Sequence, residues 1–417
     1  MRHAIKKTLL ASSIVLALGS QAAFATNGMA PHGVGIVQKG MGGAAAATSE
    51  NVMNAATNPA GLSNVKAGWE VGADVFMPDR SSTITGNANP PINGTYDGNE
   101  KELFLIPEGG YKKQLNDRHS VGVVVYGNGG MNSSYNKPIP LFGNTNAGIS
   151  LEQLIVAPTW STKINENNSV GLSVNLAYQQ FKATGLQNFG VQTPTGADLG
   201  NDSSTGVGAT IGWQGKLSPT VTAGVAYRTK TDMGKLDKYK GLFAEQGDLD
   251  MPAATTVGVA WQATPKTLVA ADIQRIEYSG VKSMANPNTM ITATPTPLGA
   301  DNGPGFGWKD QTVYKVGVKH QVKPDFAVLA GYNHGKSPID AGQTLFNMLA
   351  PATVEDHVSV GGEWTLTNKA KLAAVYTHAL DKKIDGNSSI PLAGFGGGEA
   401  DVSMKQNSVG VSYSVEF

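Results

Sequence analysis

The residue types that carry enzyme chemistry are present, but none stands in a catalytic or metal-binding spacing. The chain has no cysteine, which excludes a thiolate nucleophile and a thiolate metal site. It contains no G-x-S-x-G motif, and no two histidines have the H-x-x-x-H spacing of a metal site. The histidines after the first residues are His32, His119, His320, His334, His357 and His378. We therefore expect no enzyme activity, no metal and no cofactor.

One segment imitates a nucleotide-binding loop. Residues 331–337 read GYNHGKS, with three residues between the glycines where a P-loop has four. The segment also follows a predicted strand that leads into an external loop, where no nucleotide is available. A phosphate site is therefore not expected here.

The composition is poor in charge and rich in glycine. Lys+Arg and Asp+Glu are equal at 32 each, charged residues make up 15%, and 52 of 417 residues are glycine. An ordinary globular chain is about 25% charged and about 7% glycine. The balanced charge gives no electrostatic reason to bind nucleic acid, so no nucleic acid partner is expected.

The first 25 residues have the pattern of an export signal. Arg2, Lys6 and Lys7 precede an apolar stretch over 9–18, and Ala23-Phe24-Ala25 provides small residues for cleavage. The apolar stretch is too short to cross about 30 Å of hydrocarbon as a helix. We expect residues 1–25 to be a signal peptide that is removed on export from a bacterial cytoplasm.

Strict alternation of apolar and small or polar residues marks the rest of the chain. It is clearest over 408–417, and it recurs over 169–178, 206–213 and 220–227. Period-2 alternation is typical of outer-membrane strands, whose apolar face meets lipid and whose other face lines the lumen. Aromatic residues that favour the membrane interface end many of the apolar rows, namely Trp160, Tyr178, Trp213, Tyr227, Trp261, Trp364 and Tyr413.

The lengths of the connections predict the topology. Six short polar turns alternate with seven long segments, which gives fourteen strands from about 67–77 to about 402–417. The second long segment is placed at 127–150. The predicted fold class is all-β, a 14-stranded antiparallel transmembrane β-barrel over 66–417 with seven long extracellular loops. Its expected location is the outer membrane of a Gram-negative bacterium.

Residues 26–65 do not follow the strand pattern. They are rich in glycine and alanine, and a short helix-compatible stretch over 51–56 ends at Asn58-Pro59-Ala60. A lumen enclosed by fourteen strands leaks unless something fills it. We expect 26–65 to be an N-terminal hatch, a plug with short helices inside the barrel.

The hatch motifs resemble those of the FadL-type family of outer-membrane transporters. The residues that carry the resemblance are Gly40, Gly42 and Gly43 within Gly40–Ala44, followed by Asn58, Pro59 and Ala60. The resemblance implies a monomeric barrel that imports long-chain fatty acids or aliphatic and aromatic hydrocarbons. It also implies that these six residues form a hatch gate, and that a kink in the third strand lets ligand leave sideways into the membrane.

Three glycines are candidates for that kink. The third strand is expected at about 120–132, and it carries Gly127, Gly129 and Gly130. Glycines inside a strand weaken the ladder and often mark bulges or bends. The alternative is that these glycines begin the long loop after Tyr126, and the sequence leaves both readings open.

Apolar residues in the loops indicate a place of capture. Leu141 and Phe142 lie in the second loop, and Leu242 and Phe243 in the fourth. They predict a ligand groove, although packing of loop on loop explains such residues equally well. The expected partners are a hydrophobic small molecule and the surrounding outer-membrane lipid and lipopolysaccharide.

A carboxylate ligand would need a cation in the lumen. Arg228, Lys315 and Lys319 are at positions that could supply one, or could only solvate the lumen. The predicted function is passive uptake of hydrophobic molecules with hatch-gated lateral release. The alternatives are a general diffusion porin, which the 40-residue hatch argues against, and an outer-membrane barrel enzyme.

Overall fold

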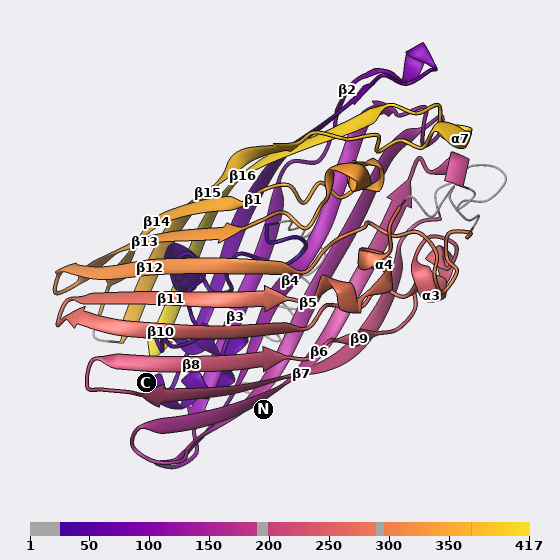
Figure 1. Cartoon of the computed structure of the whole chain (residues 1–417). Helices are drawn as coiled ribbons and strands as arrows, with labels where there is room; N and C mark the ends of the chain where they lie inside the picture. Colours follow the sequence, from indigo (N-terminus) through magenta and orange to yellow (C-terminus); the bar gives the residue numbers. More distant parts are fainter. Residues whose placement is uncertain (1–25, 190–198, 289–295, 368) are drawn as a thin grey trace, which may run out of the picture.

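The computed structural model describes residues 26–189, 199–288, 296–367 and 369–417. Within these ranges, fourteen antiparallel strands form a closed ring, because the last strand pairs with the first (Figure 1). The expected signal peptide, 1–25, lies outside the described residues. The ring strands are β1 (Gly68–Thr85), β3 (Phe104–Gln114), β4 (His119–Pro138), β5 (Asn146–Lys163), β6 (Asn168–Thr184), β7 (Asp202–Lys216), β8 (Val221–Arg228), β10 (Ala254–Thr264), β11 (Thr267–Ile276), β12 (Gln311–Lys323), β13 (Phe326–Gly335), β14 (Asp356–Thr365), β15 (Ala370–Ile384) and β16 (Glu399–Glu416).

Two short strands and several short helices complete the described chain. β2 (Gly94–Asp97) pairs with β1, and β9 (Asp232–Met233) pairs with β7. No described helix is long and apolar enough to cross a membrane. The helices are α2 (Ile36–Gly40), η2 (Val52–Ala56), η3 (Pro59–Asn64), η4 (Pro90–Ile92), η5 (Gln187–Phe189), η6 (Asp237–Tyr239), α3 (Ala244–Gly247), η7 (Tyr278–Gly280), α4 (Lys282–Ala285), η8 (Ala341–Gln343), α6 (Thr344–Asn347) and α7 (Leu392–Phe395).

The polarity of the two strand faces is reversed relative to a water-soluble protein, with apolar side chains outside the barrel and polar side chains inside. In β6, the apolar Leu172 and Val174 are more than two-fifths exposed on the outside, whereas Ser173 and Asn175 are buried. An apolar outer face and a polar inner face are stable only when the barrel is surrounded by lipid. The predicted 14-stranded transmembrane β-barrel is confirmed.

The barrel wall is taller on one side. β1, β4, β5 and β16 have 18 to 20 residues, whereas β8, β11, β13 and β14 have 8 to 10. The long strands run past the short ones at the loop end (Figure 1). Much of the expected second loop, 127–150, is therefore strand. The connection between β4 and β5 is only 139–145, because these strands keep pairing as far as Pro138 and Asn146.

The third strand of the ring, β4, loses one neighbour part of the way along. Pairing between β3 and β4 stops at Glu108 and Tyr126, whereas β3 continues to Phe104 against β1 alone. Next to this point the register of β4 against β5 shifts between Gly127 and Gly129. One extra residue, Asn128, makes a bulge there. The wall is therefore unpaired beside the bulge, and the glycines do not begin a loop.

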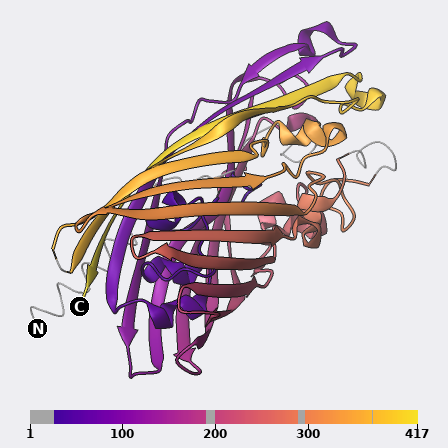
Figure 2. The ribbon, with the colours of Figure 1, turned by 60° about the vertical axis from the view of Figure 1, so that its left-hand side comes forward.

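The segment 26–65 lies within the ring, where Figure 2 shows it enclosed by strands. Helix α2 contacts β13 to β16, and η3 contacts β5 to β7. The wall glycines make this contact possible, since a Cβ atom on Gly331 would overlap the backbone nitrogen of Gly42. The abundance of glycine thus serves close approach of backbone to backbone.

Candidate functional site

An apolar pocket lies under the long loops. Ser283 has the one polar side chain among the residues that line it, and the volume of about 30 Å³ holds only one or two waters. Five phenylalanines surround it. The lining residues are Ile149, Phe181, Leu186, Phe189, Leu242, Phe243, Ser283, Leu298, Pro304, Gly305, Phe306, Phe346 and Leu349.

Two of the four predicted groove residues line this pocket, and the other two belong to the buried cluster that surrounds it. Leu242 and Phe243 line it. Phe142 packs on the lining residue Phe189 with 5.4 Å between ring centres, and Leu141 belongs to the same buried cluster. The loops therefore bring together residues from the second and fourth loops, as a capture site requires. The pocket is nearly closed by that same packing.

A second cavity lies deeper, beside the hatch. It is lined by Tyr126, Arg228 and Lys315, together with hatch residues such as Ala30 and Val34. The Arg228 guanidinium donates to Asn128 Oδ1 at 2.8 Å. Over the described ranges, neither Arg228 nor Lys315 forms an ion pair with a carboxylate.

The third predicted cation has a different environment. The Lys319 ammonium lies 2.6 Å from a Glu50 carboxylate oxygen and 2.8 Å from one of Glu363. Burial alone raises the pKa of Glu50, but Lys319 brings it below its ordinary value. Lys319 thus links the hatch to the wall through its two ion pairs. Of the three predicted cations, Arg228 and Lys315 line the deeper cavity.

Charged contacts fasten the hatch to the wall. Lys39 forms an ion pair with Asp74 at 2.7 Å. Burial alone lowers the pKa of the Lys39 ammonium, but Asp74 and Glu108 raise it above its ordinary value. One carboxylate oxygen of Asp272 accepts hydrogen bonds from the backbone N–H groups of Ala45 and Ala46 at 2.8 and 2.9 Å. Charge-assisted bonds of this kind are about twice as strong as neutral ones.

The Asn58-Pro59-Ala60 motif forms a helix start that is tied to the barrel. Asn58 Oδ1 accepts the Ala60 N–H at 3.1 Å and caps η3, whose first residue is Pro59. Asn58 Nδ2 donates to the carbonyl of Ala46 at 2.6 Å and to that of Trp213 at 3.0 Å. One side chain thus joins two parts of the hatch to β7.

The three hatch glycines sit where α2 ends. Gly42 and Gly43 have φ angles of 65° and 82°, in the left-handed region that favours glycine. Gly40 is buried against Leu329 and Val375 of the wall. Gly40 and Gly42 lie at contacts between hatch and wall, whereas Gly43 packs against His32 and Gly33 within the hatch.

The N-terminal end of the hatch lies against the β4 bulge. The Gly130 N–H donates to the Met29 carbonyl at 3.3 Å, and a Cβ atom on Gly129 would overlap that carbonyl oxygen. Gly127 is the last residue of β4 before the register shift. The structure therefore brings the predicted strand glycines and the start of the hatch together.

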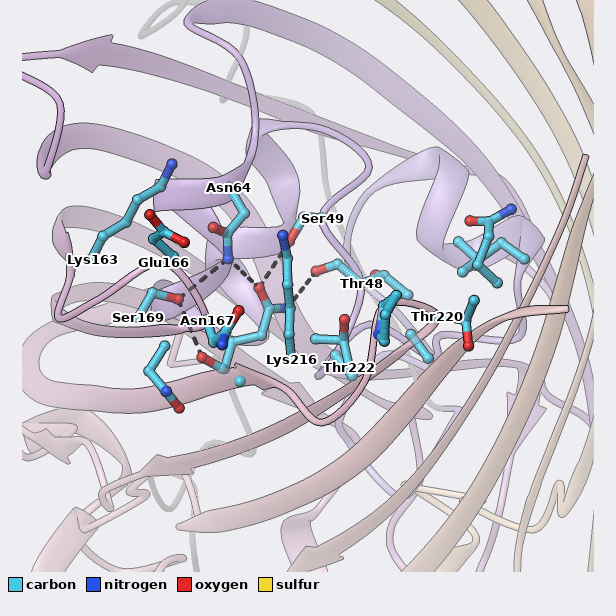
Figure 3. Close-up of a pocket in the computed structure, with 18 of the residues that line it drawn as sticks. Thr48, Ser49, Asn64, Lys163, Glu166, Asn167, Ser169, Lys216, Thr220 and Thr222 are labelled. Atoms are coloured by element: carbon cyan, nitrogen blue, oxygen red, sulfur yellow. Dashed lines mark hydrogen bonds between the residues drawn. The ribbon is translucent and has the colours of Figure 1, made fainter. Parts of the chain in front are cut away.

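A polar cavity of about 420 Å³ lies at the opposite end, near the short turns. Figure 3 shows Thr48, Ser49 and Asn64 of the hatch facing its centre. Gln214 Oε1 accepts from Ser49 Oγ at 2.9 Å and from Asn64 Nδ2 at 2.6 Å. Gln214 Nε2 donates to the Thr48 carbonyl at 2.9 Å. This lining suits water rather than a hydrophobic ligand.

Sequence reasoning missed Asp272, Glu108 and Gln214 as partners of the hatch. Each is a charged or amide residue at a lumen-facing position of a strand, and that parity was readable from the alternation. Among the described residues, no group of three or more histidines and acids could hold a metal ion.

The sequence and the fold both match known proteins. A model of the family "Outer membrane protein transport protein (OMPP1/FadL/TodX)" matches residues 12–417. No curated protein sequence matches the chain. The P. putida toluene transporter TodX has a TM-score of 0.70 at 19% identity, covering 93% of this chain and 99% of that one.

Two further solved structures show the same fold. A Pseudomonas aeruginosa FadL homologue has a TM-score of 0.70 at 16% identity, with 95% of this chain and 100% of that chain covered. The Ralstonia pickettii toluene transporter TbuX has a TM-score of 0.64 at 16% identity, with 93% and 99% covered. At these identities the likeness establishes the fold alone.

Proposed function

This chain belongs to the outer membrane transport proteins of the OMPP1/FadL/TodX family, and from that membership we propose that it takes up hydrophobic small molecules by hatch-gated lateral release. One observation carries the proposal. An apolar pocket lies at the loop end of a barrel whose axial path is filled by 26–65, while the wall beside the hatch is unpaired. A water-filled pore would have none of these features.

Capture is passive in this mechanism. Each CH₂ group that moves from water into the apolar pocket gains about 0.8 kcal/mol. The pocket must widen to admit a ligand, because its present volume is about 30 Å³. The phenylalanines that close it, such as Phe189 and Phe346, are in loops that can move without opening the strand ladder.

Release follows the gap between β3 and β4. A ligand that passes the start of the hatch reaches the bulge at Gly127, Gly129 and Gly130, where β4 has no hydrogen-bonded neighbour on the β3 side. Lipid lies outside that part of the wall, so the ligand never has to enter water. Gly40, Gly42, Gly43, Asn58, Pro59 and Ala60 hold the hatch during this step.

The deeper cavity favours a carboxylated hydrocarbon such as a long-chain fatty acid. Arg228 and Lys315 offer two cations that form no direct ion pair within the described structure, although Asp272 lies opposite Lys315 on the neighbouring strand. The second candidate is an aromatic or aliphatic hydrocarbon, which the phenylalanine-lined loop pocket would accept without any charge. In either case we expect the barrel to act as a monomer among outer-membrane lipid and lipopolysaccharide.

The β4 bulge provides the test of lateral release. Deleting Asn128 removes the extra residue that bends β4 just after its last pair with β3. The straightened strand should continue along β3 beyond Tyr126 and so narrow the gap between β3 and β4. Asn128→Ala keeps the bulge and is the matched control. Uptake of radiolabelled tetradecanoate and toluene is measured in Gram-negative cells that lack their own hydrophobe transporter. The deletion should abolish uptake and the alanine variant should retain most of it.

The same cells separate the two substrates. Lys315→Gln should lower uptake of tetradecanoate about tenfold, the usual effect of losing a charge-assisted bond, and leave toluene uptake unchanged. Equal effects on both probes would exclude the carboxylate role. Full uptake by the Asn128 deletion, with the barrel correctly assembled, would contradict lateral release.

A further inference from the structure

Tyr278 clamps the first turn of the hatch. Its hydroxyl accepts the Met29 N–H at 3.0 Å and donates to the Asn27 carbonyl at 2.6 Å. Asn27 and Ala30 close this turn through two backbone hydrogen bonds of 2.9 and 3.1 Å. Tyr278 is fully buried at the start of η7, in the fifth loop. A loop side chain therefore fixes the hatch from the extracellular side.

The ring of Tyr278 also connects to the apolar loop pocket. It meets Trp308 edge to face, with 5.1 Å between ring centres. Trp308 Nε1 donates to Asn347 Oδ1 at 2.6 Å, and Asn347 Nδ2 donates to the Phe306 carbonyl at 2.8 Å. Phe306 and Phe346, the residue before Asn347, both line the pocket. The ring of Trp308 also packs directly on that of Phe306, with 5.9 Å between ring centres, so Tyr278 is two contacts away from the place of capture.

The clamped turn reaches the wall on its other side. The Met29 carbonyl accepts the Gly130 N–H at 3.3 Å and lies directly against Gly129. These residues belong to the part of β4 that β3 leaves unpaired. A continuous set of contacts therefore runs from Phe346 through Asn347, Trp308 and Tyr278 to the bulge.

We propose that Tyr278 is a positioning residue that couples filling of the loop pocket to release of the 27–30 turn from the β4 bulge. The pocket is almost closed, so a ligand must displace Phe306 or Phe346. Packed interiors shift as units, and Trp308 moves with them. Tyr278 then loses its hydrogen-bond geometry to the turn, because such bonds weaken steeply with misalignment. This inference rests on the proposed function.

Tyr278→Phe tests the clamp, since it keeps the ring against Trp308 and removes both bonds to the hatch. Hydrogen exchange of the Gly130 amide is measured in the full-length barrel without ligand. Gly130 does not touch Tyr278 and reports only on the turn. We expect its exchange to become about tenfold faster, the usual effect of losing buried hydrogen bonds. Trp308→Phe, which removes the bond to Asn347, should act in the same direction.

Tyr239→Phe is the matched control. Tyr239 is equally buried, donates to the Gly200 carbonyl at 2.7 Å and accepts from the Ala183 N–H at 3.0 Å. Its ring meets Phe181 edge to face at 4.7 Å, and these three partners lie in the wall and loops and not in the hatch. Its loss should leave Gly130 exchange unchanged.

Coupling is measured by a double-mutant cycle on uptake of tetradecanoate and toluene. Phe346→Ala should reduce uptake in the wild type and have a clearly smaller effect in Tyr278→Phe, whose turn is already released. Unchanged exchange of the Gly130 amide in both Tyr278→Phe and Trp308→Phe would overturn the inference, as would strictly additive effects on uptake. If the wild type takes up neither probe, the proposed function fails, while Gly130 exchange still decides whether Tyr278 holds the turn.

Discussion

Several charged side chains of the hatch form ion pairs with charged side chains of the barrel wall. Lys39 meets Asp74, and Glu50 shares Lys319 with Glu363. Removing one partner from a buried ion pair leaves an uncompensated charge and costs about 3–5 kcal/mol. Such contacts therefore favour one seated position of the hatch over a loosely collapsed plug.

One acidic residue in the fourth loop gives a pH dependence. Burial raises the pKa of Asp248 to about 6, and Asp250 and Glu245 add to the rise, while Lys230 opposes it. The protonated form therefore stabilises the loop. That contribution is complete below the ordinary value of 3.8 and is lost as pH rises through about 6.

Asp248→Asn should remove this dependence, because the amide stays neutral. Amide exchange over 236–250, corrected for its intrinsic pH dependence, should show the wild-type loop opening more often at pH 7 than at pH 4. The variant should open equally at both. Asp237→Asn, at an exposed acid of the same loop, is the control and should behave as wild type. A pH-independent wild-type loop would contradict the role of Asp248.

At the scale of elements, the two 3₁₀ helices of the hatch, η2 and η3, each have a side-chain cap. Asn51 caps η2 and bonds to Gln38, entirely within the hatch, whereas Asn58 caps η3 and also reaches the wall at Trp213. A 3₁₀ helix of five or six residues has little stability alone. Its position is therefore set by these side-chain bonds.

Asn58→Ala should loosen the hatch without unfolding the barrel. Loss of the cap costs about 1 kcal/mol, and the wall bond is lost with it. Exchange over 45–64 should quicken about tenfold, and uptake should change, while heat-induced unfolding of the barrel stays the same. Asn51→Ala should quicken exchange near η2 and leave uptake close to wild type. Identical uptake in all three proteins would contradict a gating role for the Asn58-Pro59-Ala60 motif.

For the whole molecule, the closed ring and the hatch within it favour a transporter over a general diffusion porin. The hatch contacts strands on both sides of the ring, α2 against β13 to β16 and η3 against β5 to β7. The pairing of β16 with β1 closes the ring, and β4 lacks a ladder partner on its β3 side next to the bulge. The tall wall of β1, β4, β5 and β16 supports the loops that roof the apolar pocket.

Conductance in planar bilayers tests this arrangement. The intact barrel should pass little steady current, and deletion of 27–65 should produce a large steady current through the emptied lumen. Correct assembly of the deletion variant is checked by its resistance to heat and detergent. A large steady current through the intact protein would favour a general diffusion porin.

The alternation of residues predicted the barrel and its outer-membrane location, and the alternation of short and long connections predicted its fourteen strands. Which side chains share one face of a strand is a local property of the sequence. Lipid around the barrel requires the outward face to be apolar and allows the inward face to be polar, and this pattern can be recognised in the sequence. The lumen-facing positions of Lys315 and Lys319 followed from the same period. The predicted groove residues, such as Phe142 and Phe243, were also readable as apolar groups in loops.

Only the tertiary structure decided which of these residues meet. Ala45 and Asp272 are 227 positions apart, and Met29 and Tyr278 are 249 apart. The packing of the hatch inside the closed ring brings such distant pairs together. The extension of β4 to Pro138 and its bulge at Asn128 likewise depend on the register of β5, which lies beyond any local pattern. The period-2 alternation of side chains is a property of each strand by itself, whereas the strand register and the position of the hatch depend on the closed barrel as a whole.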